Sequence, residues 1–185
     1  MNRIFLTLAV LANGLLSYAV WRGMSLGDAA VQSPAVQHQV GLHIVIGLGA
    51  LIFATLVHAV ALTWFMGTGR FLEETTRAYS ISSEFYDRSR QLKYRMLPGM
   101  TLCLLLLIAT GALGAVADPA TPVSLDGTLG LSGARIHLVG AVVTVLANLV
   151  VNVFQFRAIC GNSFLIDAVL AEVRCVRAER GLSNQ

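Results

Sequence analysis

Residues 41–70 read GLHIVIGLGALIFATLVHAVALTWFMGTGR, a stretch that contains no charged residue before Arg70. About 20 apolar residues in a helix are enough to cross the hydrocarbon of a bilayer, and this stretch is longer. It nevertheless contains two histidines, His43 near one end and His58 in its body. An imidazole is costly in hydrocarbon unless it faces a protein interior, so both residues are candidates for a functional site.

The composition of the whole chain is that of a membrane protein. Of its 185 residues, 56% are hydrophobic and 12% are charged, and the mean hydropathy is +0.71, whereas about a quarter of the residues of a soluble domain are charged. We therefore expect an all-α membrane protein, a four-transmembrane-helix bundle that forms a single domain over residues 1–185. The predicted spans are residues 4–21, 38–66, 97–117 and 136–156.

The first apolar stretch fits two interpretations. Residues 4–21 follow the basic Arg3, and a short basic start before an apolar run is also typical of a signal peptide. Tyr18 and Trp21 at its far end suit the aromatic belt where a span meets the membrane interface. We interpret the stretch as the first transmembrane helix.

Glycine and proline predict where the second helix ends and the third begins. Gly67 and Gly69 follow the second span, and glycine is common just after a helix C-terminus. Pro98 is tolerated in the first turn of a helix, so it predicts the start of the third. Residues 67–96 form a polar cytoplasmic loop in which we expect two short amphipathic helices, separated by a break at 80–83.

The polar tail, residues 157–185, predicts a further amphipathic helix with Asn162 or Ser163 as its N-cap. We expect the amphipathic segments to lie on the membrane surface or to bind other subunits of a membrane complex. The segments concerned are residues 71–96 and 163–180.

The basic residues are segregated between the two sides of the predicted bundle. Eleven of the thirteen lie near the N-terminus, in the loop 67–96 and in the tail 157–185, whereas Arg22 and Arg135 lie in the other two connections. By the positive-inside rule both termini are cytoplasmic, and the expected location is a bacterial inner membrane. The net charge of +3 therefore reflects topology, and no nucleic-acid partner is indicated.

The three cysteines do not form a recognisable motif. Cys103, Cys160 and Cys175 are an odd number and are not arranged as CxxC or CxxCH. A disulfide framework and a c-type haem attachment are therefore not supported. Cys160, just past a span, is a weak candidate for palmitoylation.

Two histidines on different helices are expected at one depth. His43 lies 23 residues before Met66 and His137 lies 19 residues before Phe156, which is about 34 Å and about 28 Å along helices that rise 1.5 Å per residue. A tilt of either helix brings the two imidazoles to one level near the outer interface. Two imidazoles so placed can ligate both axial sides of a b-type haem iron, so the sequence predicts a haem b site with these ligands.

Other interpretations of this pair remain open. The two imidazoles can be amphipathic side chains with their polar tips in water, or they can handle protons. A zinc or copper site would require acids or thiolates beside them, and only Asp118 lies at that depth. Gly41, Gly47 and Gly140 would leave room for the edge of a porphyrin, and His38 is expected outside the hydrocarbon.

His58 has no histidine partner at its own level, because it lies 15 residues from His43 along the same helix. A second haem is therefore not expected. Asn148, Asn152 and Gln155 recur at intervals of four and three, so they share one helix face that we expect to point into the bundle. The interpretations of His58 are a secondary polar site with a hydrogen bond to Asn148, or contact with a quinone-like ligand.

Motifs for other chemistries are missing from the sequence. There is no GxSxG, HExxH or Walker loop, so hydrolase, transferase and nucleotide-binding functions are not supported. Four spans with histidines paired across two of them are similar to membrane cytochrome b anchors, which usually carry a second pair that this chain lacks. We expect a haem b electron-transfer subunit of a respiratory-type complex, with a quinone in the bilayer as one candidate redox partner. The alternative is a non-catalytic accessory subunit that binds a larger membrane complex; a transporter would require broken helices or midplane charges.

Overall fold

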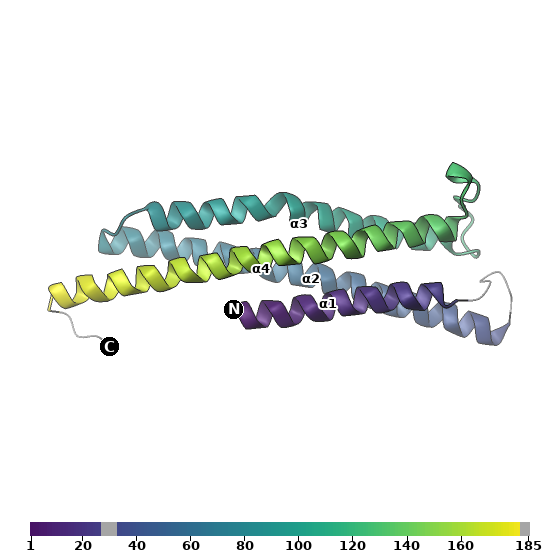
Figure 1. Ribbon diagram of the computed structural model, residues 1–185, viewed down its shortest axis with the longest axis horizontal. Coiled ribbons are helices and arrows are strands. Elements are labelled where there is room, and N and C mark those ends of the chain that lie inside the picture. The colour runs from purple at the N-terminus through teal and green to yellow at the C-terminus, as the bar shows by residue number, and fades with distance from the viewer. Residues whose placement is uncertain (27–32, 182–185) are drawn as a thin grey trace.

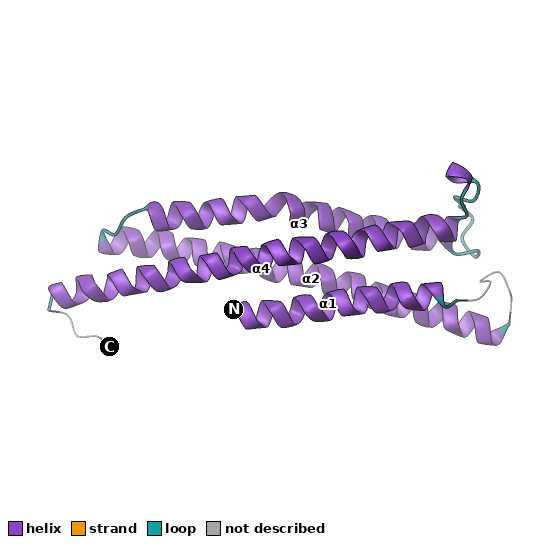
Figure 2. Ribbon diagram, viewed as in Figure 1, coloured by secondary structure: helices purple, strands orange, loops and turns teal. Residues whose placement is uncertain are grey.

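The protein consists of four long helices that run side by side (Figure 1). The structure, a computed structural model, describes residues 1–26 and 33–181. Figure 2 shows a loop between α2 and α3, and a longer connection with one short helix in it between α3 and α4. In chain order the elements are α1 (Asn2–Met24), α2 (Pro34–Tyr79), α3 (Glu84–Ala117), the short 3-10 helix η1 (Thr128–Gly130) and α4 (Gly133–Glu179).

All four long helices are long and apolar enough to cross a membrane, which confirms the predicted all-helical architecture with four helices of this kind. α1 packs against α2 and α4, and so does α3. Because α2 and α4 also contact each other, they occupy the short diagonal of the bundle. Side chains on the inner faces of α2 and α4 can therefore meet in its centre.

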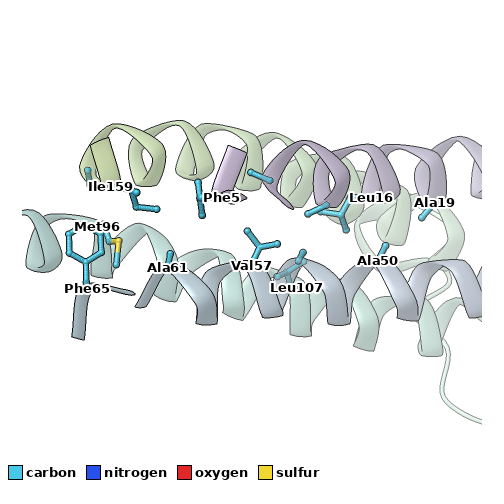
Figure 3. Packing of buried hydrophobic residues seen from close by; sticks show 14 residues of the cluster. Phe5, Leu16, Ala19, Ala50, Val57, Ala61, Phe65, Met96, Leu107 and Ile159 are labelled. Carbon is cyan, nitrogen blue, oxygen red and sulfur yellow. The ribbon is translucent and has the colours of Figure 1, made fainter. Parts of the chain in front are cut away.

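Small side chains let α1 and α2 approach each other closely (Figure 3). Without a hydrophobic drive between helices in lipid, close van der Waals packing is what holds membrane helices together. Phe5 and Leu16 of α1 fill the space beside Val57 of α2, and all three are buried. The buried alanines of this interface recur at intervals of three, four or seven residues, which keeps them on one face of each helix, and are Ala9, Ala12, Ala19, Ala50, Ala54 and Ala61.

The prediction that the second helix ends at Gly67 and Gly69 is wrong. Neither glycine has the positive φ that a glycine just after a helix needs. α2 continues until Ser80, whose φ of 57° terminates it. The helix continues because Leu72 and Thr76 are buried against neighbouring helices. Such packing outweighs the low helix propensity of two glycines, which cost about 1 kcal/mol each relative to alanine.

Two predicted helix starts are also wrong, although the predicted break at 80–83 is present. Pro98 lies inside α3, which already begins at Glu84, where acidic residues in the first turn complement the helix dipole. Asn162 and Ser163 do not cap a separate tail helix, because both lie inside α4 and Asn162 is fully buried.

Three of the helices continue well beyond the start of α1 (Figure 1). We call this three-helix part, residues 68–96 and 162–179, the extension. Leu72, Leu165 and Val169 are buried there. The residues predicted to form separate amphipathic helices are thus continuations of α2, α3 and α4, with their charges on the outer faces in pairs one helical turn apart. Of the predicted tail, residues 182–185 lie outside the described residues.

Candidate functional site

His43 of α2 and His137 of α4 meet across the diagonal of the bundle. Their ring centres are 6.2 Å apart and the ring planes are inclined by 75°. Both side chains are partly buried. The prediction that these two histidines share a level is confirmed, although the helix ends from which the depths were counted were wrong.

Each of these rings packs on a glycine from one of the other two helices, α1 or α3. A Cβ at Gly23 of α1 would lie 2.9 Å from Cε1 of His43, and a Cβ at Gly114 of α3 would lie 3.1 Å from Cε1 of His137. Real Cβ atoms rarely or never come so close to a neighbour. All four helices therefore build this site, and two of them do so by having no side chain there.

Nδ1 of His43 and Nδ1 of His137 are both buried, and neither bonds a side chain. The first ring has a backbone hydrogen-bond contact with Ala19 and the second with Thr110, one helical turn before the two glycines. Metal-bound histidines usually donate their second N–H to such a backbone carbonyl. Nδ1 of each ring therefore lies against protein, where a backbone carbonyl can fix the orientation of the ring.

The donor set of this site is two imidazoles. In residues 1–26 and 33–181, no group of three or more His, Cys, Asp or Glu side chains could hold a metal ion. A metal ion held by protein alone usually has three or four protein ligands. The pair therefore fits a metal that brings its own equatorial ligands, as haem does, better than a bare zinc or copper ion.

The glycines expected to make room for a porphyrin edge are not the ones that contact the histidines. A Cβ at Gly140 would lie 2.8 Å from Leu113 Cδ1, so this glycine is tightly packed and the expectation for it is wrong. A Cβ at Gly41 or Gly47 would meet no atom within 4 Å. Gly23 was not singled out from the sequence, because nothing in its own helix marks it as opposite a histidine.

His58 lies deeper in the bundle and is fully buried. Its Nε2 is 2.9 Å from Asn148 Oδ1, which confirms the predicted hydrogen bond. Its Nδ1 is 3.1 Å from Gln155 Oε1. Asn152, with 4% of its surface exposed, also points inward, so the predicted polar face of α4 is confirmed.

A residue of the first helix completes this cluster. Asn148 Nδ2 donates to Asn13 Oδ1 at 3.2 Å, and Asn13 Nδ2 donates to the carbonyl oxygen of Ala9 at 2.8 Å. An asparagine within an apolar run was the sequence signal for this contact. We call His58, Asn13, Asn148 and Gln155 the His58 cluster.

Two further polar contacts lie on the same inner face of α4. Thr144 and Thr110 hydroxyls are 2.7 Å apart, and Asn162 accepts from Ser89 at 2.6 Å while it donates to Thr68 at 2.7 Å. They join a polar stripe along the interior of α4 that comprises His137, Thr144, Asn148, Asn152, Gln155 and Asn162. His38, in contrast, is exposed near the start of α2.

A groove of about 480 Å³ lies beside the start of α1, lined by Met1, Thr63, Trp64 and others. Nε1 of Trp64 is buried without a partner. Neither His58 nor the His43–His137 pair lines this groove. A quinone head in it would therefore touch neither histidine site.

No family model, no curated protein and no solved structure matches this chain.

Proposed function

We propose that this protein is a membrane haem b subunit that transfers electrons, with His43 and His137 as the axial ligands. The observation that carries the proposal is the 6.2 Å between their ring centres. An imidazole nitrogen lies about 1.1 Å from its ring centre and binds a metal at about 2.0 Å, so two opposed imidazoles on one metal have centres about 6 Å apart. The pair thus has the separation that two axial ligands need.

The porphyrin would supply four equatorial nitrogens, and its iron would supply the one-electron chemistry. The chain's own residues have the remaining tasks. Gly23 and Gly114 accept the flanks of the two rings. The backbones of Ala19 and Thr110 are available to receive the Nδ1–H groups and so to orient the Nε2 atoms.

Orientation and partners follow from the charge distribution. With eleven basic residues on the side of the termini, the positive-inside rule puts the termini and the extension in the cytoplasm and the His43–His137 pair near the outer face. We therefore propose electron exchange with an outward-facing donor or acceptor or with a quinone in the bilayer. A bacterial inner membrane suits this role.

A reduced-minus-oxidised absorbance spectrum tests the proposal. The protein is produced in cells supplied with haem and purified in mild detergent, and we expect Soret and α bands of a low-spin haem. His43→Ala and His137→Ala should abolish the bands. His38→Ala is the matched control, because this histidine is exposed, and it should retain them. Intact helical protein without bands would contradict the proposal.

A second candidate function is that of an accessory subunit, favoured by the extension. Phe164 is 73% exposed on it, and we propose that this large apolar side chain contacts a partner subunit. Copurification in mild detergent, with wild type compared to Phe164→Ser, tests this function. Retention of the same partner subunits by both proteins, or no partner subunit with either, would contradict it.

A further inference from the structure

A backbone carbonyl determines which atom donates and which accepts in each hydrogen bond from Asn13 to His58. The carbonyl oxygen of Ala9 can only accept, so the atom of Asn13 that lies 2.8 Å from it must be the amide nitrogen. Asn13 Oδ1 then accepts from Asn148 Nδ2. Asn148 Oδ1 is left to face Nε2 of His58. Because this oxygen also can only accept, His58 must carry a hydrogen on Nε2.

The other nitrogen of His58 therefore has the free lone pair. A neutral imidazole carries one ring hydrogen, so a hydrogen on Nε2 leaves Nδ1 as an acceptor. Nδ1 lies 3.1 Å from Oε1 of Gln155, which can only accept, so the neutral ring requires this amide to turn its NH₂ group toward Nδ1. That amide can turn either its NH₂ group or its oxygen toward the ring, and its own Nε2 has no other partner to lose. Gln155 can thus bond His58 in the neutral and in the protonated form.

The surroundings of Nδ1 are polar but uncharged. The four predicted spans contain no Asp, Glu, Lys or Arg. The partners of His58 are amides of α4, and an amide of α1 in turn bonds one of them. On the same inner face of α4, both polar atoms of Asn152 are buried without partners. The other ionisable residues of the four spans are Tyr18, His38, His43, Cys103 and His137.

We propose that the His58 cluster is a proton-accepting site inside the membrane, at which Nε2–H is held fixed and Nδ1 takes up the proton. The proton adds to the Nδ1 lone pair and the imidazole becomes an imidazolium. The oxygen of Gln155, which lies 3.1 Å from Nδ1, accepts the new N–H, and no other covalent bond forms or breaks. Amide dipoles, in place of a carboxylate, stabilise the charge. This site does not depend on haem at the His43–His137 pair.

Nitrogen NMR of protein labelled at histidine, in lipid nanodiscs, tests the fixed hydrogen. At neutral pH we expect one neutral tautomer of His58, with its hydrogen on Nε2, and His58→Gln identifies its signals by their loss. Asn13→Leu removes the end of the relay, so a mixture of tautomers is expected. A hydrogen on Nδ1 in the wild type would overturn the assignment.

Replacements of Gln155 test proton uptake. Gln155→Glu places a carboxylate on Nδ1, so His58 should carry hydrogens on both nitrogens at neutral pH. Gln155→Leu, the matched control, should leave Nδ1 unprotonated with the Nε2 hydrogen in place. In the wild type, acidification should protonate Nδ1 before the helices unfold, as followed by circular dichroism.

Unchanged signals of His43 and His137 verify that each variant is folded. Two results would contradict the proposed proton-accepting site. One is an unprotonated Nδ1 in folded Gln155→Glu at neutral pH, and the other is a wild type in which Nδ1 stays unprotonated until the helices unfold.

Discussion

The two histidine sites of this protein lie on the same diagonal but satisfy their nitrogens differently. His58 is fully buried and both of its ring nitrogens have amide partners. His43 and His137 are partly buried, and each has a backbone contact, with Ala19 or Thr110, while its ring presses on a glycine. Burial alone would suggest that His58 is the more functional residue. The hydrogen bonds favour the other site, because both ring nitrogens of His58 bond side chains, whereas Nδ1 of His43 and Nδ1 of His137 bond none.

The difference bears on what each site contributes to folding. Interhelical hydrogen bonds in membranes contribute about 0.6 kcal/mol on average and up to about 1.7 kcal/mol. The His58 cluster makes several such bonds between α1, α2 and α4, so it stabilises the bundle without any ligand. The Nδ1 atoms of the His43–His137 pair bond no side chain, and the contacts of the two rings are with the backbone of Ala19 and Thr110. Its arrangement is better explained by a ligand than by stability.

The largest effect is expected from filling the glycine surface beside the pair. Gly114→Leu would push the His137 ring away, since even a Cβ there would lie 3.1 Å from Cε1. We expect at least a tenfold loss of bound haem per protein, measured by absorbance. Gly47→Leu is the control because a Cβ there meets no atom within 4 Å. Equal haem content in both variants would contradict the role of Gly114.

The second largest effect is a difference in the free energy of unfolding between substitutions at the two sites. His58→Leu leaves the amides of Asn148 and Gln155 without their ring partner, so it should lower the free energy of unfolding by about 1–3 kcal/mol. In haem-free protein, His43→Leu should change it by less than about 0.5 kcal/mol. Unfolding in mixed detergent micelles, followed by circular dichroism, measures both. A larger loss for His43→Leu would reverse the comparison.

A smaller loss of stability is expected from Thr144→Val, which changes a residue of α4 that lies between the two histidine sites. Thr144→Val removes the 2.7 Å bond to the Thr110 hydroxyl and should cost about 0.6 kcal/mol by the same measurement. Val keeps the shape of the side chain, so packing is unchanged. Haem content and the His58 NMR signals should both stay as in the wild type. A change in either would mean that the sites are coupled through this contact.

The smallest effect is expected at Asp126, which accepts from the backbone N–H of Gly133 at 2.7 Å. This bond, and then the one with Ser124, holds the pKa of the carboxyl below its ordinary value of 3.8. The carboxylate therefore stabilises the start of α4 at neutral pH, and this stabilisation is lost as the pH falls below about 4 through the folded-state pKa.

Asp126→Asn should thus be slightly less stable than the wild type at pH 7 and equal to it at low pH, by thermal unfolding. An equal difference at both pH values would contradict the titration. Asp126 bonds Gly133, the first residue of α4, which lies four residues before His137. We therefore expect the substitution to change the haem content more than the NMR signals of His58.

The pattern of apolar residues and the position of each histidine along its helix predicted much of this molecule, because both depend on spacing within a single helix. Long apolar stretches are sufficient to predict four spans, and a rise of 1.5 Å per residue is sufficient to bring His43 level with His137. The same reasoning placed Asn148 beside His58, which the structure confirms. These features depend on spacing along a helix rather than on which helices become neighbours.

The features that could not be predicted depend on contacts between distant segments. Gly67 and Gly69 resemble a helix end, but the packing of Leu72 and residues beyond it keeps α2 helical. Neither Gly23 nor Asn13 can be assigned to a histidine without knowing which face of α1 meets α2 and α4. A local pattern contains no information on that choice.

The bond between Asn13 and Asn148 joins residues separated by 135 positions. In a chain made from its N-terminus, the Asn13 oxygen of α1 lacks this partner until α4 has been made. α2 inserts with His58 in the same condition, because both of its amide partners are on α4. The last helix therefore completes the hydrogen bonds of the first two. A nascent chain without α4 has unpaired polar groups on α1 and α2, which membrane quality control can recognise.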